Sequence, residues 1–297
     1  MANAIATNGT HKRKETYANE VLTIARSEMN IYEDFSTDYE VDGATGQINV
    51  PTRNGEVELS DYDILNGISL KQSATDYLVL PIDKNYACNE LIDGYEAEAV
   101  PDNIRAQRIE SAGYSFGMKK EGFAIDALKT GTISSDTEAL TKTTVYEKIA
   151  KEVSNMKKRN MKVNSMRIVV DADTELLLLT DDKFANTSGT LGEELVREGV
   201  IGKINGVPVK PNYLLGNVIR EEGAGSSKAN KTRKVEFAIY DKRFCQKYEN
   251  WAVEPTINDL KDGKHIGASA LQGRQVGGLM VTNALGVQVK LGAEVTA

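Results

Sequence analysis

Ser115 lies at the centre of Gly113-Tyr-Ser-Phe-Gly117, which matches the G-x-S-x-G pattern of a nucleophile elbow. In that chemistry the serine attacks a carbonyl carbon, a histidine accepts the serine proton, and an acid orients the histidine. Asp241 and His265 follow in the chain order that the elbow requires. However, the elbow needs a strand before the serine, and residues 101–112 have the apolar spacing of a helix. In a helix, the Ser115 hydroxyl is expected to donate to a carbonyl oxygen one turn back, so it is unavailable for attack.

Few other groups are suited to catalysis or to metal binding. His11 lies in a polar leader and His265 in a Gly-Lys-His-Ile-Gly turn, so neither has the converging ligands of a zinc site. Cys88 and Cys245 lack C-x-x-C spacing, and we expect both to be small core residues in a reducing compartment. Residues 223–228 share the composition of a phosphate loop but lack its spacing and its following helix.

Four aspartates could offer oxygen ligands to a hard cation such as calcium, namely Asp171, Asp173, Asp181 and Asp182. Asp173 is better interpreted as a helix cap, and the other three as solvated ends of helices. We therefore predict no catalytic residue, no cofactor-binding residue and no metal ligand in this chain. The prediction is a protein without a cofactor that is not an enzyme.

The composition limits the class of protein. The 297 residues are 40% hydrophobic and 27% charged, which supports a core and excludes disorder over the whole length. No apolar run approaches the ~20 residues of a membrane span, and residues 1–10 lack the apolar region of a secretory signal. The net charge is −7, and the only short basic clusters are Lys12–Lys14 and Lys157–Arg159. We assign the second to a helix end, where it complements the macrodipole, and expect no direct DNA binding.

Residues 1–84 consist of two segments that differ in their sequence patterns. Residues 1–38 are predicted to be an arm, in which residues 21–29 have the apolar spacing of a short amphipathic helix. Residues 39–84 alternate short β patterns with turn signals, and Asn54-Gly55 predicts a hairpin. The second segment is too polar to form a core, so we interpret it as a projecting β-loop.

A long helix is predicted from Pro101 to about Lys129, because proline is well placed in a first helical turn. The residues expected on its inward face are Ile109, Ala112, Gly113, Phe116, Phe123, Ala124 and Ala127. Those expected elsewhere are Arg105, Arg108, Lys119, Glu121 and Asp126. If the Phe123 ring is fully buried, Phe123→Ala should cost ~3–5 kcal/mol.

Residues 130–142, rich in Thr, Ser and Gly, form an internal boundary, after which helices alternate with strands. Thr144 with Glu147 predicts a capping box, and Asp173 and Thr190 are expected to cap two further helices. The expected strands are 167–170, a strand-turn-strand at 204–209, 235–240, 248–253 and a final β region at 277–289. This order predicts an α+β fold in which helices pack on a sheet.

Three stretches carry a resemblance to a known family: residues 121–128, 199–209 and 271–289. They include Gly206-Val-Pro-Val209 and Val281-Thr-Asn-Ala284. With the element order, they resemble the major capsid proteins of tailed bacteriophages, which have the Hong Kong ninety-seven type fold also found in encapsulins. The resemblance spans nearly the whole chain.

The resemblance implies five regions. These are an N-terminal arm at 1–38, an extended β-loop at 39–84, a peripheral domain with a long spine helix at 85–142, an axial domain at 143–260, and return strands to the peripheral domain at 261–297. The arm and the β-loop would then lie over neighbouring subunits, and we expect deletion of residues 45–75 to leave a folded subunit that builds no stable shells.

The function implied is that of a shell subunit. Pentamers and hexamers would close into an icosahedral head that encloses DNA without sequence-specific binding and without a membrane. A portal protein and a separate scaffolding protein are the implied partners. The implied location is the virion, after assembly in the host bacterial cytoplasm. Two alternatives stay open: an encapsulin-type compartment shell, and a serine hydrolase that uses Ser115.

Overall fold

The computed structural model describes residues 30–37, 46–53, 59–70, 75–94, 102–136, 138–184, 200–217, 219–222, 231–261 and 263–294. Several predicted features lie outside these residues: the helix at 21–29, the Asn54-Gly55 turn, Pro101, the helix that begins at Thr190, and residues 223–228. No helix in the described part of the chain is long and apolar enough to cross a membrane.

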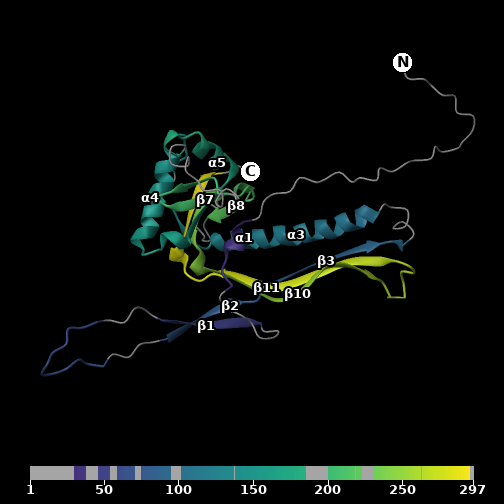
Figure 1. The fold of residues 1–297 in the computed structure, drawn as a ribbon, viewed down its shortest axis with the longest axis horizontal. Helices are drawn as coiled ribbons and strands as arrows, with labels where there is room; N and C mark the ends of the chain where they lie inside the picture. The colour runs from purple at the N-terminus through teal and green to yellow at the C-terminus, as the bar shows by residue number, and fades with distance from the viewer. Residues whose placement is uncertain are drawn as a thin grey trace, which may run out of the picture.

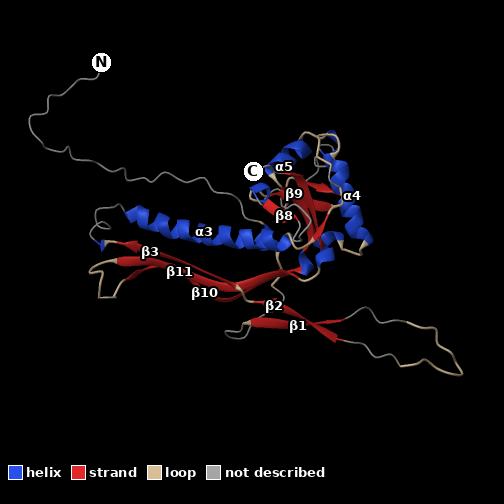
Figure 2. Cartoon of the chain, turned by 180° about the vertical axis from the view of Figure 1, so that it is seen from behind, coloured by secondary structure: helices blue, strands red, loops and turns tan. Residues whose placement is uncertain are grey.

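One unit is a long antiparallel sheet covered by a single helix. Its strands are β3 (Lys84–Ile92), β11 (Ser269–Val281) and β10 (Cys245–Asp259), with β11 in the centre. Helix α3 (Asp102–Leu128) runs along one face of this sheet, as Figures 1 and 2 show from opposite sides. Ala112, Phe116 and Ala124 are buried on the helix, as predicted, and Phe123 and Ala127 are half-buried. Ile109 and Gly113 are exposed, so their placement on the inward face is wrong.

The other unit is a seven-stranded mixed sheet with helices on it, ordered β4-β12-β9-β5-β7-β6, while β8 pairs with β9. Its elements are β4 (Thr132–Ile133), α4 (Val145–Lys158), β5 (Met166–Val170), α5 (Ala172–Leu179), β6 (Gly202–Ile204), β7 (Val207–Pro211), β8 (Ile219–Glu222), β9 (Lys231–Asp241) and β12 (Val287–Glu294). Short 3-10 turns lie at Val163–Ser165, Leu215–Asn217, Lys242–Phe244 and Ala284–Gly286. The predicted α+β class is confirmed.

The local predictions in this unit have mixed outcomes. The turn between β6 and β7 is the predicted one, because Asn205 and Gly206 both have positive φ angles, 51° and 86°. The capping box at Thr144 is wrong: its backbone is helical, and its hydroxyl contacts Thr141 instead. The cap of α5 is Asp171 and not Asp173, because the Asp171 carboxylate accepts from the Thr174 N–H at 2.9 Å.

The two C-terminal regions expected from the sequence, 143–260 and 261–297, each contribute strands to both sheets. Strand β10, within residues 143–260, pairs with β11 in the three-stranded sheet. Strand β12, within residues 261–297, pairs with β9 and β4 in the seven-stranded sheet. The chain therefore passes between the two units at residues 241–245 and again at 281–287, which differs from the expected division at residue 260.

A two-stranded ribbon projects from the junction of the two units (Figure 1). Strand β1 (Gln47–Arg53) pairs with β2 (Thr75–Pro81), so that Gln47 lies opposite Pro81 and Arg53 opposite Thr75. The prediction that the strand before Asn54-Gly55 pairs with the segment directly after it is wrong. Its partner comes more than twenty residues later in the chain, and the described residues between the two strands, 59–70, lie at the far end of the β-loop.

Phe123 is half-buried, so the premise of full burial does not hold. Its ring meets Tyr86 edge-on at 5.5 Å and lies beneath the Lys84 and Lys119 ammonium groups at 5.4 and 5.2 Å. We expect Phe123→Ala to lower the free energy of unfolding by about 1–2 kcal/mol, because less apolar area is lost than in a sealed core. Urea denaturation measures this, and a loss above about 3 kcal/mol would show that the ring is more buried than described.

Candidate functional site: an exposed β-loop and its anchor

The described far end of the β-loop, residues 59–70, places apolar side chains in solvent. Leu59 is 93% exposed, Leu65 is 92% exposed, and Tyr62, Ile64, Ile68 and Leu70 are also exposed. Single exposed apolar residues are ordinary, but a run of six within twelve positions is typical of an interaction surface. In Figure 1 this segment extends away from both sheets.

The tip of the β-loop is a defined turn built around Asp63. The Gly67 N–H donates to the Asp63 carbonyl at 2.8 Å, and Gly67 has a φ of 68°. The Asp63 carboxylate accepts from the Leu65 N–H at 2.9 Å and from the Asn66 amide at 2.6 Å. These hydrogen bonds lower the pKa of Asp63, with the Leu65 N–H as the larger cause. The turn therefore holds the Ile64 and Leu65 side chains outward before any partner binds.

The base of the β-loop, in contrast, packs on the three-stranded sheet. Val50 and Leu80 are buried against Tyr248 of β10. The Tyr248 hydroxyl donates to the Pro81 carbonyl, and burial raises the pKa of this tyrosine to about 12. Gly278 of β11 lies beneath this contact, where a Cβ atom would stand 2.2 Å from the Pro81 oxygen. A glycine is thus needed for the loop to sit this close to the sheet.

We expect Gly278→Ala to release the base of the β-loop while leaving the seven-stranded sheet intact. The added methyl group meets the backbone oxygen of Pro81 and the Tyr248 hydroxyl, so β2 must move away. Hydrogen–deuterium exchange should rise several-fold in residues 46–53 and 75–81 and stay unchanged in β5 and β9. Gly113→Ala is the control, because nothing lies within 4 Å of the position of its Cβ atom. Equal exchange in both variants would contradict the close contact.

A buried carboxylate anchors the chain just before the β-loop. Glu121 of α3 is fully buried, although the sequence placed it off the inward face. It accepts from the backbone N–H groups of Ile31 at 2.9 Å and Tyr32 at 2.8 Å, and from the Asn212 amide at 2.5 Å. It therefore satisfies the N-terminal N–H groups of α1 (Ile31–Asp34), whose own Asn30 makes no side-chain cap.

The same short helix is held by a second buried carboxylate and by apolar packing. Asp34 accepts from the Tyr240 hydroxyl at 2.9 Å and forms ion pairs with Lys210 and Lys242. Ile31 and Phe35 are buried in a core that lies between the C-terminal end of α3 and the seven-stranded sheet. The expectation that the arm lies over neighbouring subunits therefore fails for residues 30–37, which pack on their own chain.

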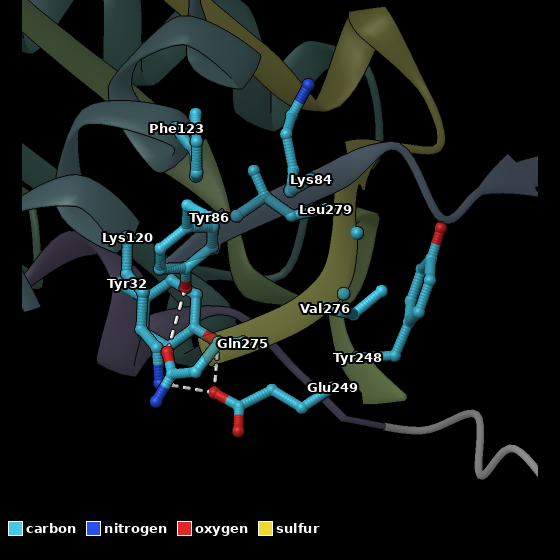
Figure 3. A pocket seen from close by; sticks show the side chains of 12 residues that line it. Tyr32, Lys84, Tyr86, Lys120, Phe123, Tyr248, Glu249, Gln275, Val276 and Leu279 are labelled. Carbon is cyan, nitrogen blue, oxygen red and sulfur yellow. Dashed lines mark hydrogen bonds and ion pairs between the residues drawn. The ribbon is translucent and has the colours of Figure 1, made fainter. Parts of the chain in front are cut away.

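Tyr32 of the arm and Tyr248, which contacts the base of the β-loop, both line a small cavity of about 20 Å³, room for one water molecule (Figure 3). The Tyr32 hydroxyl donates to Glu249 at 3.0 Å, and Lys120 of α3 forms an ion pair with the same carboxylate. Burial opposes ionisation of Glu249, but the hydrogen bond and charge of Lys120 outweigh it, so its pKa is lowered. Because Glu249 follows Tyr248, adjacent residues of β10 contact the arm and the β-loop.

The three residues considered as a hydrolase triad, Ser115, Asp241 and His265, do not lie together. Ser115 lies within α3, and its hydroxyl donates to the Ser111 carbonyl at 2.9 Å, as predicted. Asp241 is buried at the end of β9 and forms an ion pair with Arg243, just before β10, whereas His265 lies in the turn beyond the other end of β10. Fifteen residues of extended strand separate these ends by roughly 45 Å. No hydrolase triad therefore forms from these three residues.

The cysteines and aspartates considered for catalysis or metal binding do not form a site either. Cys245 is buried and Cys88 is half-buried, and both are free thiols. In the described part of the chain, no three His, Cys, Asp or Glu side chains gather as they would around a metal ion. Asp171 caps α5 and Asp181 accepts from the Lys183 N–H, and both are buried, so the prediction that they are solvated ends of helices is wrong.

Sequence reasoning missed Glu121 and Asp34, the two residues that fix the anchor. A signal for Glu121 was present, because Ile125 and Leu128 follow it at helical spacing and both are buried. Helix α3 therefore has a second buried face, which begins at Glu121 and continues with Ile125 and Leu128. Asp34 offered no such signal, since its partners Tyr240 and Lys242 lie some two hundred residues away in the chain.

No protein-family model matches the sequence, and no curated protein matches it. Solved structures do match over nearly the whole chain. A structure from Mycobacterium phage Che8 is 18% identical, with 93% of this chain and 96% of that chain covered and a TM-score of 0.72. The capsid structure of the cyanophage P-SCSP1u is 13% identical, with 95% and 93% covered and a TM-score of 0.77.

The mature capsid of bacteriophage PhiM1 is also 13% identical, with 96% of this chain and 93% of that chain covered and a TM-score of 0.70. At identities of 13–18%, the similarity is one of backbone fold. The chain has the α+β fold of tailed-phage capsid proteins, the Hong Kong ninety-seven type.

Proposed function

We propose that the chain is a major capsid protein, which self-assembles into the icosahedral head shell around a phage genome. The observation that carries the proposal is the β-loop, whose apolar residues at 59–70 lie in solvent while its base is buried. Such a surface is complete only when a partner covers it. The capsid fold supports a second copy of the chain as that partner.

The energetics favour repeated contacts between identical subunits. Burial of Leu59, Ile64, Leu65 and Leu70 would contribute roughly 6–12 kcal/mol before the entropic cost of association, at about 1.5–3 kcal/mol for each side chain. When each subunit donates its loop to one neighbour and receives a loop from another, the contact is heterologous. Rotations that close such contacts give the pentamers and hexamers of a shell.

The regional roles follow from this proposal. The arm would extend over residues 1–38 and the β-loop over 39–84. The peripheral domain would be the three-stranded sheet with α3 as its spine helix, and the axial domain the seven-stranded sheet with α4 and α5. Partners would be a portal protein and a separate scaffolding protein. The shell would assemble in the bacterial cytoplasm, become part of the virion and enclose DNA.

Electron microscopy of the purified full-length protein, expressed with and without a scaffolding protein, tests the proposal. We expect closed shells, tubes or ring-shaped capsomers. A monodisperse monomer under all of these conditions would overturn it. The particle contents distinguish the related alternative, because an encapsulin-type compartment would hold one specific enzyme instead of nuclease-protected nucleic acid.

A further inference from the structure

Positive charge is concentrated around the C-terminal end of α4. Residues 148–167 contain seven basic residues and one acidic residue, although the whole chain has a net charge of −7. The basic residues are Lys148, Lys151, Lys157, Lys158, Arg159, Lys162 and Arg167. The one acidic residue, Glu152, is buried and accepts from Ser134 and Asn155. Its charge therefore does not face the solvent with theirs.

In the described part of the chain, most of these cations form no ion pair with a carboxylate, unlike many lysines elsewhere. Lys120, Lys129 and Lys183 each form an ion pair, and so does Lys148. Among the described residues, no carboxylate lies within ion-pair distance of Lys151, Lys157, Lys158, Arg159 or Lys162. We call these five residues the α4 basic face.

The helix macrodipole does not account for this concentration. A helix C-terminus carries about half a negative charge, and its effect is confined to the last turn. Lys151 lies about two turns before the end of α4, on the same side as Lys158, and Lys162 lies beyond the end. The Lys157 ammonium donates to the Asn205 carbonyl at 2.9 Å and Arg159 to Gln288 at 3.0 Å, so their positions are fixed by the fold.

We propose that the α4 basic face contacts the phosphate backbone of nucleic acid without reading its sequence. No large apolar side chain of residues 145–167 is exposed, so the face lacks the apolar centre typical of a protein interface. Unpaired lysines on a rigid element suit phosphates, because each contact releases condensed counterions. The inference rests on the proposed function only for the source of the nucleic acid, the genome inside the shell.

In both overall views, the β-loop tip projects toward the same end of the molecule as α4, which lies on the side of the seven-stranded unit farthest from the free end of α3 (Figures 1 and 2). The β-loop tip is acidic, with Asp61 and Asp63 and no basic residue in 59–70, so a second copy could compete for the basic face. The test therefore includes that contact as an outcome.

The test compares two quadruple variants of the full-length protein for binding to a fluorescent 30-base-pair DNA duplex at several salt concentrations. One carries Lys151→Gln, Lys157→Gln, Lys158→Gln and Lys162→Gln. The control carries Lys119→Gln, Lys142→Gln, Lys234→Gln and Lys261→Gln, four exposed lysines elsewhere. For the first variant we expect at least a tenfold loss of affinity and a decrease of roughly three to four in the slope of log affinity against log salt.

The control should lose less than about threefold in affinity, and a second duplex of unrelated sequence should bind equally. Equal losses in both variants, or no loss in either, would overturn the inference. If the first variant binds DNA normally but builds no shells, the face contacts protein, and the inference is wrong. If the wild-type protein builds no shells while only the first variant loses DNA affinity, the proposed function fails and this inference stands.

Discussion

Replacement of residues 54–74 by an Asn-Gly turn is expected to give a folded subunit that no longer assembles. Arg53 and Thr75 are direct partners in the β1–β2 ribbon, so a two-residue turn can close the ribbon at that point. The replacement removes the exposed apolar segment and keeps Val50 and Leu80 in their contact with Tyr248. It is a sharper version of deleting residues 45–75, which would also remove β1.

Assembly is scored by electron microscopy and sedimentation, and folding by circular dichroism and thermal melting. We expect shells to fall from the main species to none, with the melting temperature within about 3 °C of wild type. A matched pair of variants refines the result. Leu59→Ser with Ile64→Ser, Leu65→Ser and Leu70→Ser should also abolish shells, whereas Leu176→Ser with Leu179→Ser and Leu285→Ser, also exposed, should not. Normal shells from the loop variants would remove the basis of the proposed function.

Glu121→Ala is expected to lower the free energy of unfolding by about 3–5 kcal/mol. The carboxylate accepts from the N–H groups of Ile31 and Tyr32 and from the Asn212 amide, in a buried position. Its removal leaves these donors without their acceptor and opens a cavity, and each unsatisfied buried donor costs about 1–3 kcal/mol. The first effect should be release of residues 30–37 from α3.

Urea denaturation gives the change in stability, and hydrogen–deuterium exchange locates it. Asp126→Ala on the same helix is the control, because Asp126 is exposed and forms a surface ion pair with Lys129. Such a surface pair is worth roughly 0–1 kcal/mol. If Glu121→Ala is no more destabilising than this control, then Glu121 does not anchor the arm.

Local patterns in the sequence predicted the elements whose structure is locally determined. The spacing of apolar residues placed α3 within one or two residues, and Asn205-Gly206 identified its turn, because only a few residue types accept positive φ angles there. The same kind of signal at Asn54-Gly55 misled the pairing of β1. A turn signal does not specify which later strand is the partner, and β2 supplies the better apolar face with Leu78 and Leu80.

The anchor could not be predicted because its partners are distant in sequence. Glu121 and α1 are separated by about ninety residues, and Asp34 and Tyr240 by 206. A charged residue on a helix is by default solvated, and only the chain that covers it makes it a cap. Whether a residue of the α4 basic face has a carboxylate partner among the described residues is equally a tertiary property, since it depends on where carboxylates from other elements lie.

Side-chain oxidation by hydroxyl radicals, measured by mass spectrometry before and after assembly, most directly tests whether sister subunits cover the β-loop. The account predicts that oxidation of Leu59, Tyr62, Ile64 and Leu65 decreases at least fivefold when subunits form shells. Buried residues such as Phe237 should react little in either state. Shells in which the loop residues stay as reactive as in the free subunit would contradict the account.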